Sequence, residues 1–420
     1  MSAPALRFKA FSDKWKAVPF GDIFTFRTTN SYSRECLNYS SGKVKNIHYG
    51  DIHTQFKSRF YINRERVPFV NEEIDLSKIS SESYCKEGDL VIADASEDYK
   101  DIGKCIEIAS IDSQPVIAGL HTFLARPSLG SLYNGFIGYA MQSNAVRLQI
   151  MTIAQGTKVL SISTGRLSKV KVPLPSIEEQ TKIANFLTVV DEKITQLTQK
   201  HELLAQYKKG VMQQIFSQAL RFKDDNGQDF PEWETLSLGD IATRVTRKNK
   251  ENNLNVLTIS AQQGLINQEE YFHKSVSAKD VTNYYLLHMG DFAYNKSYSK
   301  GYPMGAIKCL NRYKKGVVST LYICFKFNDG NINAFFEHYF EAGLQNAEID
   351  KVAQEGARNH GLLNIGLNDF FSINLTIPSI REQEKIAKFL TAIEDKLLHA
   401  YNQLTAAKQY KQGLLQQMFV

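Results

Sequence analysis

Cysteine is scarce in this chain of 420 residues, and its few cysteines form no recognisable framework. The set is odd in number and has no Cys-x-x-Cys spacing, which argues against a disulfide scaffold and against a zinc site. We therefore expect reduced thiols in a cytoplasmic compartment. The five cysteines are Cys36, Cys85, Cys105, Cys309 and Cys324.

Long apolar runs are missing as well. No stretch reaches the roughly 18 consecutive apolar residues that predict a transmembrane helix. The first residues, MSAPALRFKAFSDKWK, lack the apolar segment of a signal peptide. The sequence thus predicts a cytoplasmic protein that does not enter a membrane.

The motifs of common enzyme classes are also absent. We find neither the Gly-Lys-Ser/Thr phosphate loop nor the Gly-x-Gly-x-x-Gly dinucleotide fingerprint. Among the scattered histidines only His48 and His53 are close, and their spacing does not place both on one helix face. No catalytic triad or ligand cluster with workable spacing appears, so we expect no catalytic residue, metal or cofactor in this chain.

What remains is an ordinary globular composition. Hydrophobic residues make up 43% and charged residues 22% of the chain, enough to bury a core in each of several domains. The net charge of +6 is compatible with an anionic partner.

The most informative feature is an internal repeat. Residues 175–216 return without a gap as residues 378–419, with 19 of 42 positions identical. A shorter repeated segment lies upstream of each copy: Ala5-Leu6-Arg7-Phe8-Lys9 recurs as residues 219–223. The chain is therefore two tandem units, and this duplication fixes the architecture before any local motif is weighed.

Both copies of the repeat predict a long helix. Apolar residues recur at alternating spacings of three and four, as in a coiled coil. Ser176 and Ser379 are plausible N-caps, and Glu179 and Glu382 stand three residues on as capping-box partners. A long amphipathic helix packed on its own domain is the alternative. The stripe comprises Ile183, Leu187, Val190, Ile194, Leu197, Leu204, Val211 and Ile215 in the first copy, and Ile386, Leu390, Ile393, Leu397, Ala400, Leu404, Ala407, Leu414 and Met418 in the second.

The segments around the helices carry short β-rich runs with Gly-Asp turns, typical of α+β globules. Short connections would make the two helices antiparallel, with the globules separated by them, a pseudo-twofold relation and a nearly circular chain. A helix of this length measures about 60 Å. The predicted boundaries are 1–174 for the first globule, 175–217 for the first helix, 218–377 for a linker and the second globule, and 378–420 for the second helix.

This organisation resembles the specificity subunit of type I restriction–modification systems. The resemblance covers essentially the whole chain and includes the Trp-x5-Gly-Asp-Ile starts and the Tyr-Lys-x-Gly-x-x-Gln-Gln-x-Phe helix ends. The matching motif residues are Pro175, Ser176, Glu179, Gln180, Ile183, Ala184, Phe186 and Leu187, with counterparts Pro378, Ser379, Glu382, Gln383, Ile386, Ala387, Phe389 and Leu390.

The resemblance implies a non-catalytic subunit with two target recognition domains, each specific for one part of a split, asymmetric sequence in double-stranded DNA. It also implies two methyltransferase subunits docked on the helices, and restriction subunits added to that core. Adenine methylation and ATP-driven cleavage would belong to those partners, together with their S-adenosylmethionine, ATP and magnesium. The chain itself lacks the Asn/Asp-Pro-Pro-aromatic tetrapeptide of adenine methyltransferases. A coiled-coil protein–protein scaffold without DNA specificity is the alternative.

DNA contacts require cations for phosphates and polar groups for base edges, and loops are where such groups concentrate. Two stretches that follow a Gly-Asp turn and a strand meet this description, although solvated hairpin loops would look similar. The candidates are Asn295, Lys296, Tyr298, Lys300 and Tyr302 in the second globule, and Asp94, Glu97, Tyr99, Lys100 and Lys104 in the first.

A second pair of loops precedes the long helices, and a plain structural turn is the alternative for both. Their candidates are Gln155, Thr157 and Lys158 in the first globule, and Arg358, Asn359 and His360 in the second. Weaker candidates in the first globule are Lys45, His48, Gln55, Lys57 and His121.

Three polar residues interrupt the helical stripe: His201, Lys208 and Lys411. Polar groups in a coiled-coil seam set the register at some cost in stability. Contact with the methyltransferase or with the DNA between the two target parts is the other possibility.

Overall fold

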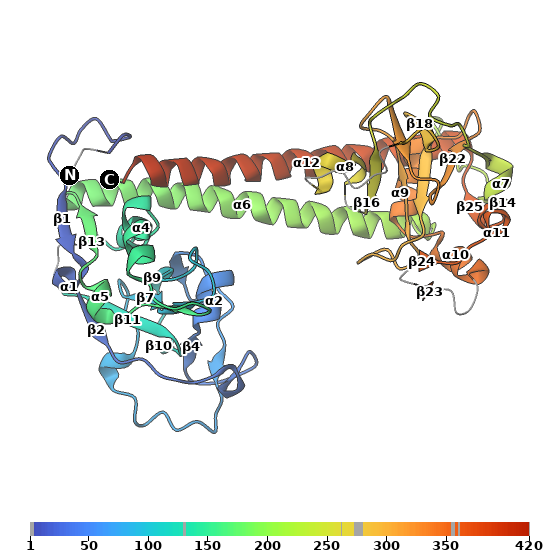
Figure 1. Ribbon diagram of the computed structural model, residues 1–420. Coiled ribbons are helices and arrows are strands. Elements are labelled where there is room, and N and C mark those ends of the chain that lie inside the picture. Colours follow the sequence, from blue (N-terminus) through green and yellow to red (C-terminus); the bar gives the residue numbers. More distant parts are fainter. Residues whose placement is uncertain are drawn as a thin grey trace. The chain divides into compact units, whose positions relative to one another are not determined.

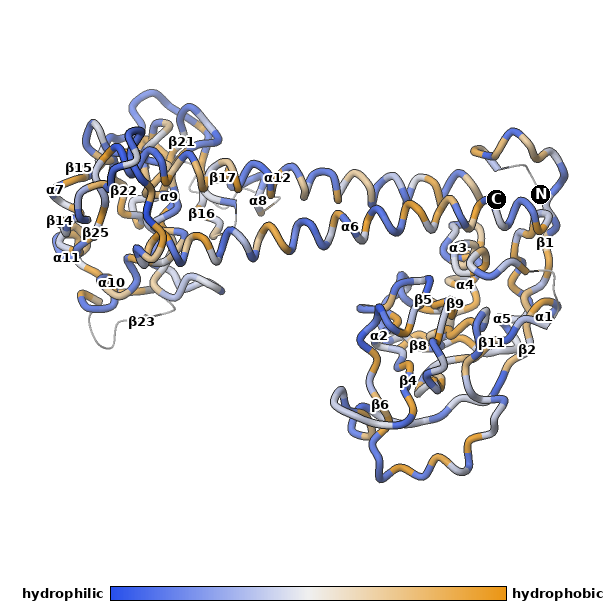
Figure 2. Tube along the Cα trace, turned by 180° about the vertical axis from the view of Figure 1, so that it is seen from behind, coloured by the Kyte–Doolittle hydropathy of each residue, from blue (hydrophilic) through white to orange (hydrophobic). Residues whose placement is uncertain are grey.

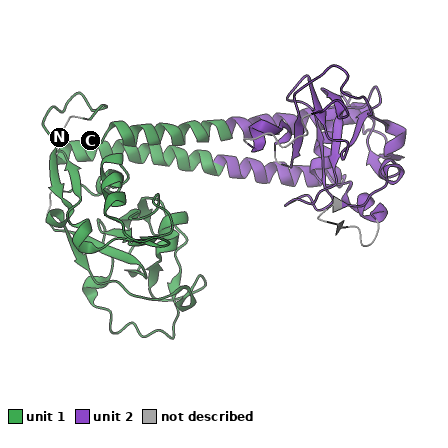
Figure 3. Cartoon of the chain, in the orientation of Figure 1, with its two compact units in different colours: residues 1–199, 401–420 green, residues 200–400 purple. Residues whose placement is uncertain are grey.

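A computed structural model describes residues 4–128, 132–261, 263–272, 280–353, 358–359 and 362–419. The chain divides into two compact units, shown in Figure 3. Unit 1 comprises Met1–Gln199 and Tyr401–Val420, and unit 2 comprises Lys200–Ala400. Within the described ranges, every helix is too short or too polar to cross a lipid bilayer.

Unit 1 is built on a mixed five-stranded sheet (Figure 1). Its strand order is β2 (Phe24–Arg27), β11 (Thr122–Pro127), β7 (Leu90–Ala93), β9 (Cys105–Ser110) and β5 (Arg59–Tyr61). A four-stranded sheet has the order β10 (Val116–Ala118), β4 (Lys45–Ile47), β6 (Phe69–Val70) and β3 (Leu37–Asn38). Two short antiparallel pairs join β1 (Lys16–Pro19) to β13 (Lys171–Leu174) and β8 (Ala95–Ser96) to β12 (Leu160–Ser161).

The central strand β7 shows why this sheet is buried on both faces. Its four residues, Leu-Val-Ile-Ala, are all buried. Because side chains alternate across a strand, Leu90 and Ile92 join one hydrophobic cluster, and Val91 and Ala93 join another. The first cluster includes the short helices α1 (Phe20–Ile23), α3 (Ile137–Ala140), α4 (Asn144–Ile153) and α5 (Thr164–Leu167), and the second includes α2 (Tyr49–Thr54).

Unit 2 repeats this plan with a smaller sheet. Its antiparallel order is β15 (Ala242–Arg244), β22 (Ile323–Phe327), β19 (Phe292–Asn295) and β20 (Ala306–Cys309). Four further pairs join β14 (Glu234–Ser237) to β25 (Asn374–Ile377), β16 (Leu257–Ser260) to β17 (Gly264–Asn267), β18 (Tyr285–His288) to β21 (Lys315–Val318), and β23 (Arg358–Asn359) to β24 (Leu362–Leu363). The short helices are α7 (Leu238–Ile241), α8 (Gln268–Phe272), α9 (Asn333–Glu341), α10 (Asn346–Val352) and α11 (Leu367–Phe371).

The same turn leads into the central strand of each unit. In unit 1 the Asp89 carboxylate accepts the Lys86 amide N–H at 2.8 Å, and in unit 2 Asp291 accepts the His288 amide at 2.8 Å. An arginine neutralises each aspartate, Arg126 in unit 1 and Arg247 in unit 2. The equivalent β-strands are therefore β7 and β19, although few of their residues are alike.

Each copy of the repeat forms one long helix, α6 (Ile177–Phe216) and α12 (Ile380–Gln417), as predicted. Figure 2 shows hydrophobic and hydrophilic residues alternating along both. In unit 1 the start of α6, with Ile183 and Leu187, shares a core with Leu414 and Met418 at the end of α12. In unit 2 the end of α6, with Ile215, packs in one cluster with the start of α12. These contacts make the two helices antiparallel and confirm the predicted α+β fold with paired long helices.

The repeated Glu-Gln pair anchors each helix to its unit. The buried Glu179 carboxylate accepts from the Arg7 guanidinium at 2.7 Å, and the buried Glu382 carboxylate accepts from Arg221 at 2.8 Å. The Glu179 backbone N–H donates to Ser176 Oγ at 3.4 Å, as an N-cap would require. In a capping box the glutamate side chain would bind the backbone N–H at the start of the helix. Here the two glutamate side chains bind arginines of the repeated Ala-Leu-Arg-Phe-Lys segments.

The matching glutamines hold a second loop. Gln180 Oε1 accepts the Tyr133 amide N–H at 3.0 Å, and Gln383 Oε1 accepts the Ile332 amide at 3.3 Å. These amides lie just before α3 and α9. The repeated motif therefore fastens the same part of each globule to the helix that follows it.

The first and last described segments of the chain meet within unit 1. The Leu6 amide N–H donates to the Gln417 carbonyl at 2.9 Å, and the Phe419 ring packs against Trp15 at 6.1 Å between ring centroids. In unit 2 the same places are taken by Phe216 and Trp233, whose rings are 6.5 Å apart. Each globule thus closes on the end of the other long helix, which is why the chain is nearly circular.

Candidate nucleic-acid interface

The two loops predicted as DNA contacts lie side by side in unit 1. Strand β8, inside the loop that follows β7, pairs with β12, inside the loop that precedes α6. The Ile162 amide N–H also donates to the Asp94 carbonyl at 3.0 Å. These bonds place Gln155, Thr157 and Lys158 next to the segment that begins with Asp94.

Unit 2 brings its two loops together by an equivalent bond. The Leu363 amide N–H donates to the Lys296 carbonyl at 3.0 Å, so the β23–β24 hairpin lies against the loop that follows β19. Arg358 and Asn359 form the first strand of this hairpin, while His360 lies outside the described residues. Asp94 and Lys296 occupy matching positions but carry opposite charges.

Helix α2 adds a cluster of rings to this side of unit 1. The Tyr49 ring lies 4.7 Å from the His48 ring, 5.7 Å from His53 and 5.3 Å from His121, between centroids. His121 Nδ1 is 3.4 Å from a carboxylate oxygen of Asp94. Burial raises the pKa of Asp94, so its charge is least costly when a cation is near. The α2 cluster and the loop after β7 therefore form one continuous surface.

His48 belongs to this cluster but is buried. Its Nδ1 accepts the Gly50 amide N–H at 3.2 Å and caps α2. Burial lowers the pKa of His48 to about 4, so the ring is neutral at physiological pH. The side chain holds α2 in place and is not part of the exposed surface.

Most of the other predicted side chains on these loops are exposed. The loop before α6 bends at Gly156, whose φ of +127° and close approach to the Val159 carbonyl leave no room for a Cβ. The bend directs the chain back so that Gln155 pairs with Ser161. The exposed candidates are Gln55, Lys57, Glu97, Tyr99, Lys100, His121, Gln155, Thr157 and Lys158 in unit 1, and Tyr298 and Lys300 in unit 2.

Several predicted residues have partners within the chain. Lys45 Nζ lies over the Phe69 ring at 5.1 Å, and Lys57 Nζ donates to Thr195 of α6 at 2.9 Å. Lys104 Nζ donates to the His53 carbonyl, which ties the loop to α2. The Tyr302 hydroxyl donates to Glu341 at 2.8 Å, and burial raises the pKa of this tyrosine. Asn295 closes its own loop, because its Oδ1 accepts the Ser297 amide N–H at 3.0 Å.

A groove that no sequence motif predicted lies next to the Thr122 end of this surface. It has a volume of about 580 Å³ and is lined by Thr28, Thr29, Asn30, Ser31, Tyr32, Lys78, Ile79, Ser80, Ser83, Ile117 and Ala118. Thr29 Oγ1 donates to the Thr122 carbonyl at 3.1 Å. The sequence signal for the groove is the hydroxyl-rich run Thr-Thr-Asn-Ser-Tyr-Ser at residues 28–33.

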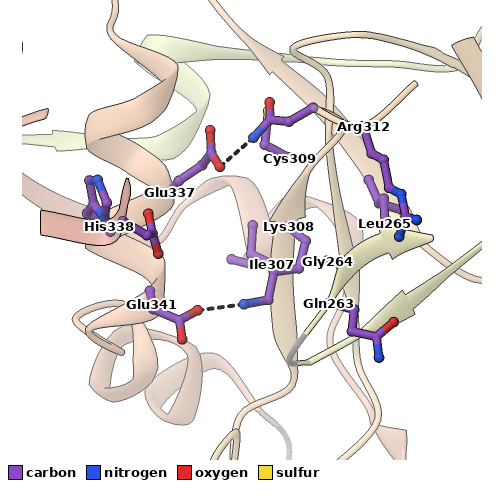
Figure 4. Close-up of a pocket in the computed structure, with 12 residues that line it drawn as sticks. Gln263, Gly264, Leu265, Ile307, Lys308, Cys309, Arg312, Glu337, His338 and Glu341 are labelled. Carbon is purple, nitrogen blue, oxygen red and sulfur yellow. Dashed lines mark hydrogen bonds and ion pairs between the residues drawn. The ribbon is translucent and has the colours of Figure 1, made fainter. Parts of the chain in front are cut away.

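Unit 2 contains a polar pocket of about 300 Å³ between α9, β20 and α12 (Figure 4). Its acids have partners, because Lys308 pairs with Glu341, and Asn311 Nδ2 donates to Glu337 at 2.6 Å. His338 Nε2 is 3.2 Å from Thr391 Oγ1 of α12, and burial lowers the pKa of this histidine. No group of three metal-ligating side chains occurs in the part of the chain that the structure describes. The pocket is a compensated polar contact between the globule and the helix.

Two of the three polar residues of the helical stripe form ion pairs between the long helices. Lys411 Nζ is 2.7 Å from Asp191 in unit 1, and Lys208 Nζ is 2.6 Å from Glu394 in unit 2. His201 is half-buried in the stripe. The lysines thus interact with acids on the opposite helix.

The sequence matches the type I restriction modification DNA specificity domain family at residues 12–205 and again at residues 231–406. The chain belongs to this family. The two matches correspond to the two globules, each with part of the helix that follows it.

Individual relatives agree. The chain is 25% identical over 360 residues to the putative type I restriction enzyme MjaX specificity subunit of Methanocaldococcus jannaschii, covering 77% of this chain and 78% of that protein. It is 30% identical over 92 residues to the MjaVIII specificity subunit of the same organism, covering 21% and 22%.

Solved structures show the same fold. The S subunit of a type I restriction–modification system from M. genitalium matches with a TM-score of 0.60 at 14% identity, covering 100% of this chain and 99% of that one. A chain from a study of complex assembly and conformational transition in the type I R-M system matches with a TM-score of 0.53 at 14% identity, covering 96% and 97%.

Proposed function

We propose that this chain is the DNA-binding specificity subunit of a type I restriction–modification complex and that it recognises a two-part, asymmetric target in double-stranded DNA. The observation that carries this proposal is the pairing of the two candidate loops in each unit by equivalent backbone bonds, at Asp94 and at Lys296. The two units share this backbone arrangement but carry different side chains on it, as expected of two recognition surfaces with different base preferences.

The difference between the loops has direct consequences for base contacts. A carboxylate such as Asp94 accepts a hydrogen bond from cytosine N4, whereas a lysine such as Lys296 donates to guanine or to phosphate. Exposed Lys158 and Lys300 supply further cations for the DNA backbone. The two units would therefore recognise different bases, and the target would be asymmetric.

The repeated helices support two copies of one partner. Tyr207 and Tyr410 hold matching positions, and their exposed fractions are 52% and 58%. Three residues further on, a Cβ added at Gly210 or Gly413 would meet nothing within 4 Å. Glycine inside a helix costs about 1 kcal/mol relative to alanine, so its presence at both places suits close approach by another molecule. We assign these surfaces to two methyltransferase subunits.

The remaining parts of the proposal follow from the family. Lys208, Lys411 and His201 would set the register of the helices and so the length of DNA between the two target parts. Restriction subunits would join the complex, and catalysis with its cofactors would belong to the partners, all in the cytoplasm. The boundaries 1–174, 175–217, 218–377 and 378–420 would delimit the first recognition domain, the first spacer helix, the linker with the second recognition domain, and the second spacer helix.

Single-molecule methylation sequencing of cells that express the full chain with its methyltransferase tests the proposal. We expect a methylated motif of two specified parts separated by unspecified bases. Lys296→Asp should alter one part only, and Asp94→Lys the other, whereas Lys45→Gln should alter neither because Lys45 lies over Phe69. A continuous motif, or methylation independent of this chain, would contradict the proposal and favour a scaffold without DNA specificity.

A further inference from the structure

Two exposed arginines of unit 1 are stacked on tyrosine rings. Strand β5 ends at Tyr61, and the turn that follows contains Arg64 and Arg66. The Arg64 guanidinium lies 4.4 Å from the Tyr61 ring centroid, and the Arg66 guanidinium lies 4.6 Å from that of Tyr39. We call residues 61–66 together with Tyr39 the stacked-arginine turn. Neither arginine forms an ion pair with a carboxylate among the residues that the structure describes.

Two other stacked cations of the chain differ in this respect. Arg312 lies 5.7 Å from the Tyr313 ring centroid but is bound to Glu270 at 3.2 Å. Lys411 lies over Tyr139 and is bound to Asp191. In those two cases a carboxylate within the chain already pairs with the cation, whereas the side chains of Arg64 and Arg66 are exposed to solvent.

Stacking prepares a guanidinium for an anion. The ring contact orients the planar group and leaves its N–H edge available, and that edge matches the oxygens of a phosphate in a bidentate contact. Two such groups, separated by one residue in the chain, form a cationic surface that is already ordered before an anion binds.

The stacked-arginine turn is continuous with the candidate interface. Tyr39 also contacts Arg34, whose guanidinium donates to Tyr39 Oη at 3.3 Å and pairs with Asp51 of α2. Helix α2 in turn contains Tyr49, the centre of the ring cluster beside His121. One end of the stacked-arginine turn therefore adjoins the surface proposed to recognise bases.

The other end adjoins α6. Arg59, at the start of β5, donates to Thr188 Oγ1 at 2.9 Å, and a small cleft between Arg64 and α6 is lined by Glu65, Asp191 and Glu192 among others. Asp191 is bound to Lys411, and Glu65 accepts the Lys57 amide N–H at 3.4 Å. Burial raises the pKa of Glu65. Glu192 is the one exposed acid of the cleft. Lys57, Arg59, Arg64 and Arg66 outnumber Glu65 and Glu192, and Lys411 balances Asp191, so the formal charge of the surface is positive.

We propose that the stacked-arginine turn binds phosphates of the DNA that adjoins the bases recognised by unit 1, on the side toward α6. This inference rests on the proposed function and adds a sequence-independent contact to it. The bound DNA would belong to the unspecified part of the target, where contact with the backbone positions the duplex without selecting a sequence.

The test uses the full chain purified with its methyltransferase, carrying Arg64→Gln and Arg66→Gln together. Affinity for a duplex with the methylated motif and for a scrambled duplex is measured by fluorescence anisotropy over a range of salt concentrations. Each lost phosphate contact reduces the slope of log K against log salt by about 0.9, so we expect a slope smaller by about 1 to 2. Affinity for both duplexes should fall by the same factor, and the methylated bases should stay unchanged.

Two further variants make the result specific. Arg312→Gln removes a stacked but ion-paired cation of unit 2 and should leave the slope unchanged. Arg64→Lys with Arg66→Lys keeps the charge and should restore part of the slope, and thermal melting establishes that each variant is folded. An unchanged slope in the glutamine variant, a loss confined to the motif duplex, or loss of methyltransferase binding with normal DNA affinity would each overturn the inference. If the wild-type complex does not distinguish the two duplexes, the proposed function fails as well.

Discussion

Lys411 Nζ lies 2.7 Å from an Asp191 carboxylate oxygen, on the opposite long helix of unit 1. The residues at the same places of the other repeat, Lys208 and Glu394, are 2.6 Å apart in unit 2. Each unit therefore has a lysine–carboxylate pair at an equivalent position between its two helices. Each copy of the repeat supplies the acid to one unit and the lysine to the other.

Breaking this pair should reveal its contribution. We expect Lys411→Ala to destabilise the protein by about 1 kcal/mol, because the pair is half-buried and Asp191 keeps the Tyr139 hydroxyl as a donor at 2.8 Å. A double-mutant cycle with Asp191→Ala, measured by thermal melting, should give a coupling energy of the same order. The control is Lys193→Ala, which removes an exposed lysine of α6. A coupling energy near zero would refute the register role.

Inserting four residues after Gln199 tests whether the helices set the DNA spacing. The insertion adds about one helical turn, or about 6 Å, so the unspecified part of the methylated motif should lengthen by about two base pairs. The bases of both target parts should stay unchanged in methylation sequencing. The same insertion after Asn226, in the exposed polar linker, should leave the motif as it is. Altered bases in either part would argue against this model.

The two arginine anchors should differ in strength. Glu179 also accepts from the Trp15 indole at 3.2 Å, whereas the corresponding indole nitrogen of Trp233 has no partner among the described residues. Removing one partner of a buried pair costs about 3 kcal/mol or more, so Arg221→Gln should lower the melting temperature strongly. Arg7→Gln should cost less, because Trp15 still serves its glutamate. Equal losses in the two variants would show that the indole contributes nothing.

Glu107 should make stability depend on pH. Burial raises the pKa of this glutamate to about 7, although its carboxylate accepts the amide N–H groups of Gly135 and Gly138 at 2.6 and 2.7 Å. A raised pKa means that the unfolded chain loses the proton first. The stabilisation is therefore complete below the ordinary glutamate pKa and decreases as pH rises toward 7.

Glu107→Gln provides the measurement. The amide cannot ionise, so the variant does not lose this stabilisation as pH rises. Between pH 5 and pH 8 its free energy of unfolding, measured by thermal melting, should rise relative to wild type by about 2 kcal/mol. Glu97→Gln, at an exposed position of the same unit, is the control and should show no such trend. A constant difference across this pH range would contradict the assignment.

Local and periodic signals predicted a large part of this protein. The apolar stripe from Ile183 to Ile215 predicted α6, because a 3–4 spacing reports burial along one helix face. The repeat predicted the paired helices. The capping box predicted at Glu179 was half correct. The Glu179 backbone N–H donates to Ser176 Oγ, but its carboxylate binds Arg7, which is 172 residues away in sequence.

The candidate site was predictable only in outline. The sequence selected the loops at Asp94 and at Lys158, but their contact depends on the pairing of β8 with β12, which joins segments about 65 residues apart. That these loops bind DNA remains a prediction.

Duplication and hydrophobic period are properties of the order of the residues, so the two units, the long helices and the family could be predicted before any coordinates. Which charged side chains lack an ion pair is visible only in the folded chain. Arg64 and Arg312 look alike in sequence, and only the folded chain places Glu270 beside one of them and no described carboxylate beside the other. An ion pair forms over a few ångströms in space. That distance depends on the path of the backbone through the sheets, which no local pattern in the sequence records.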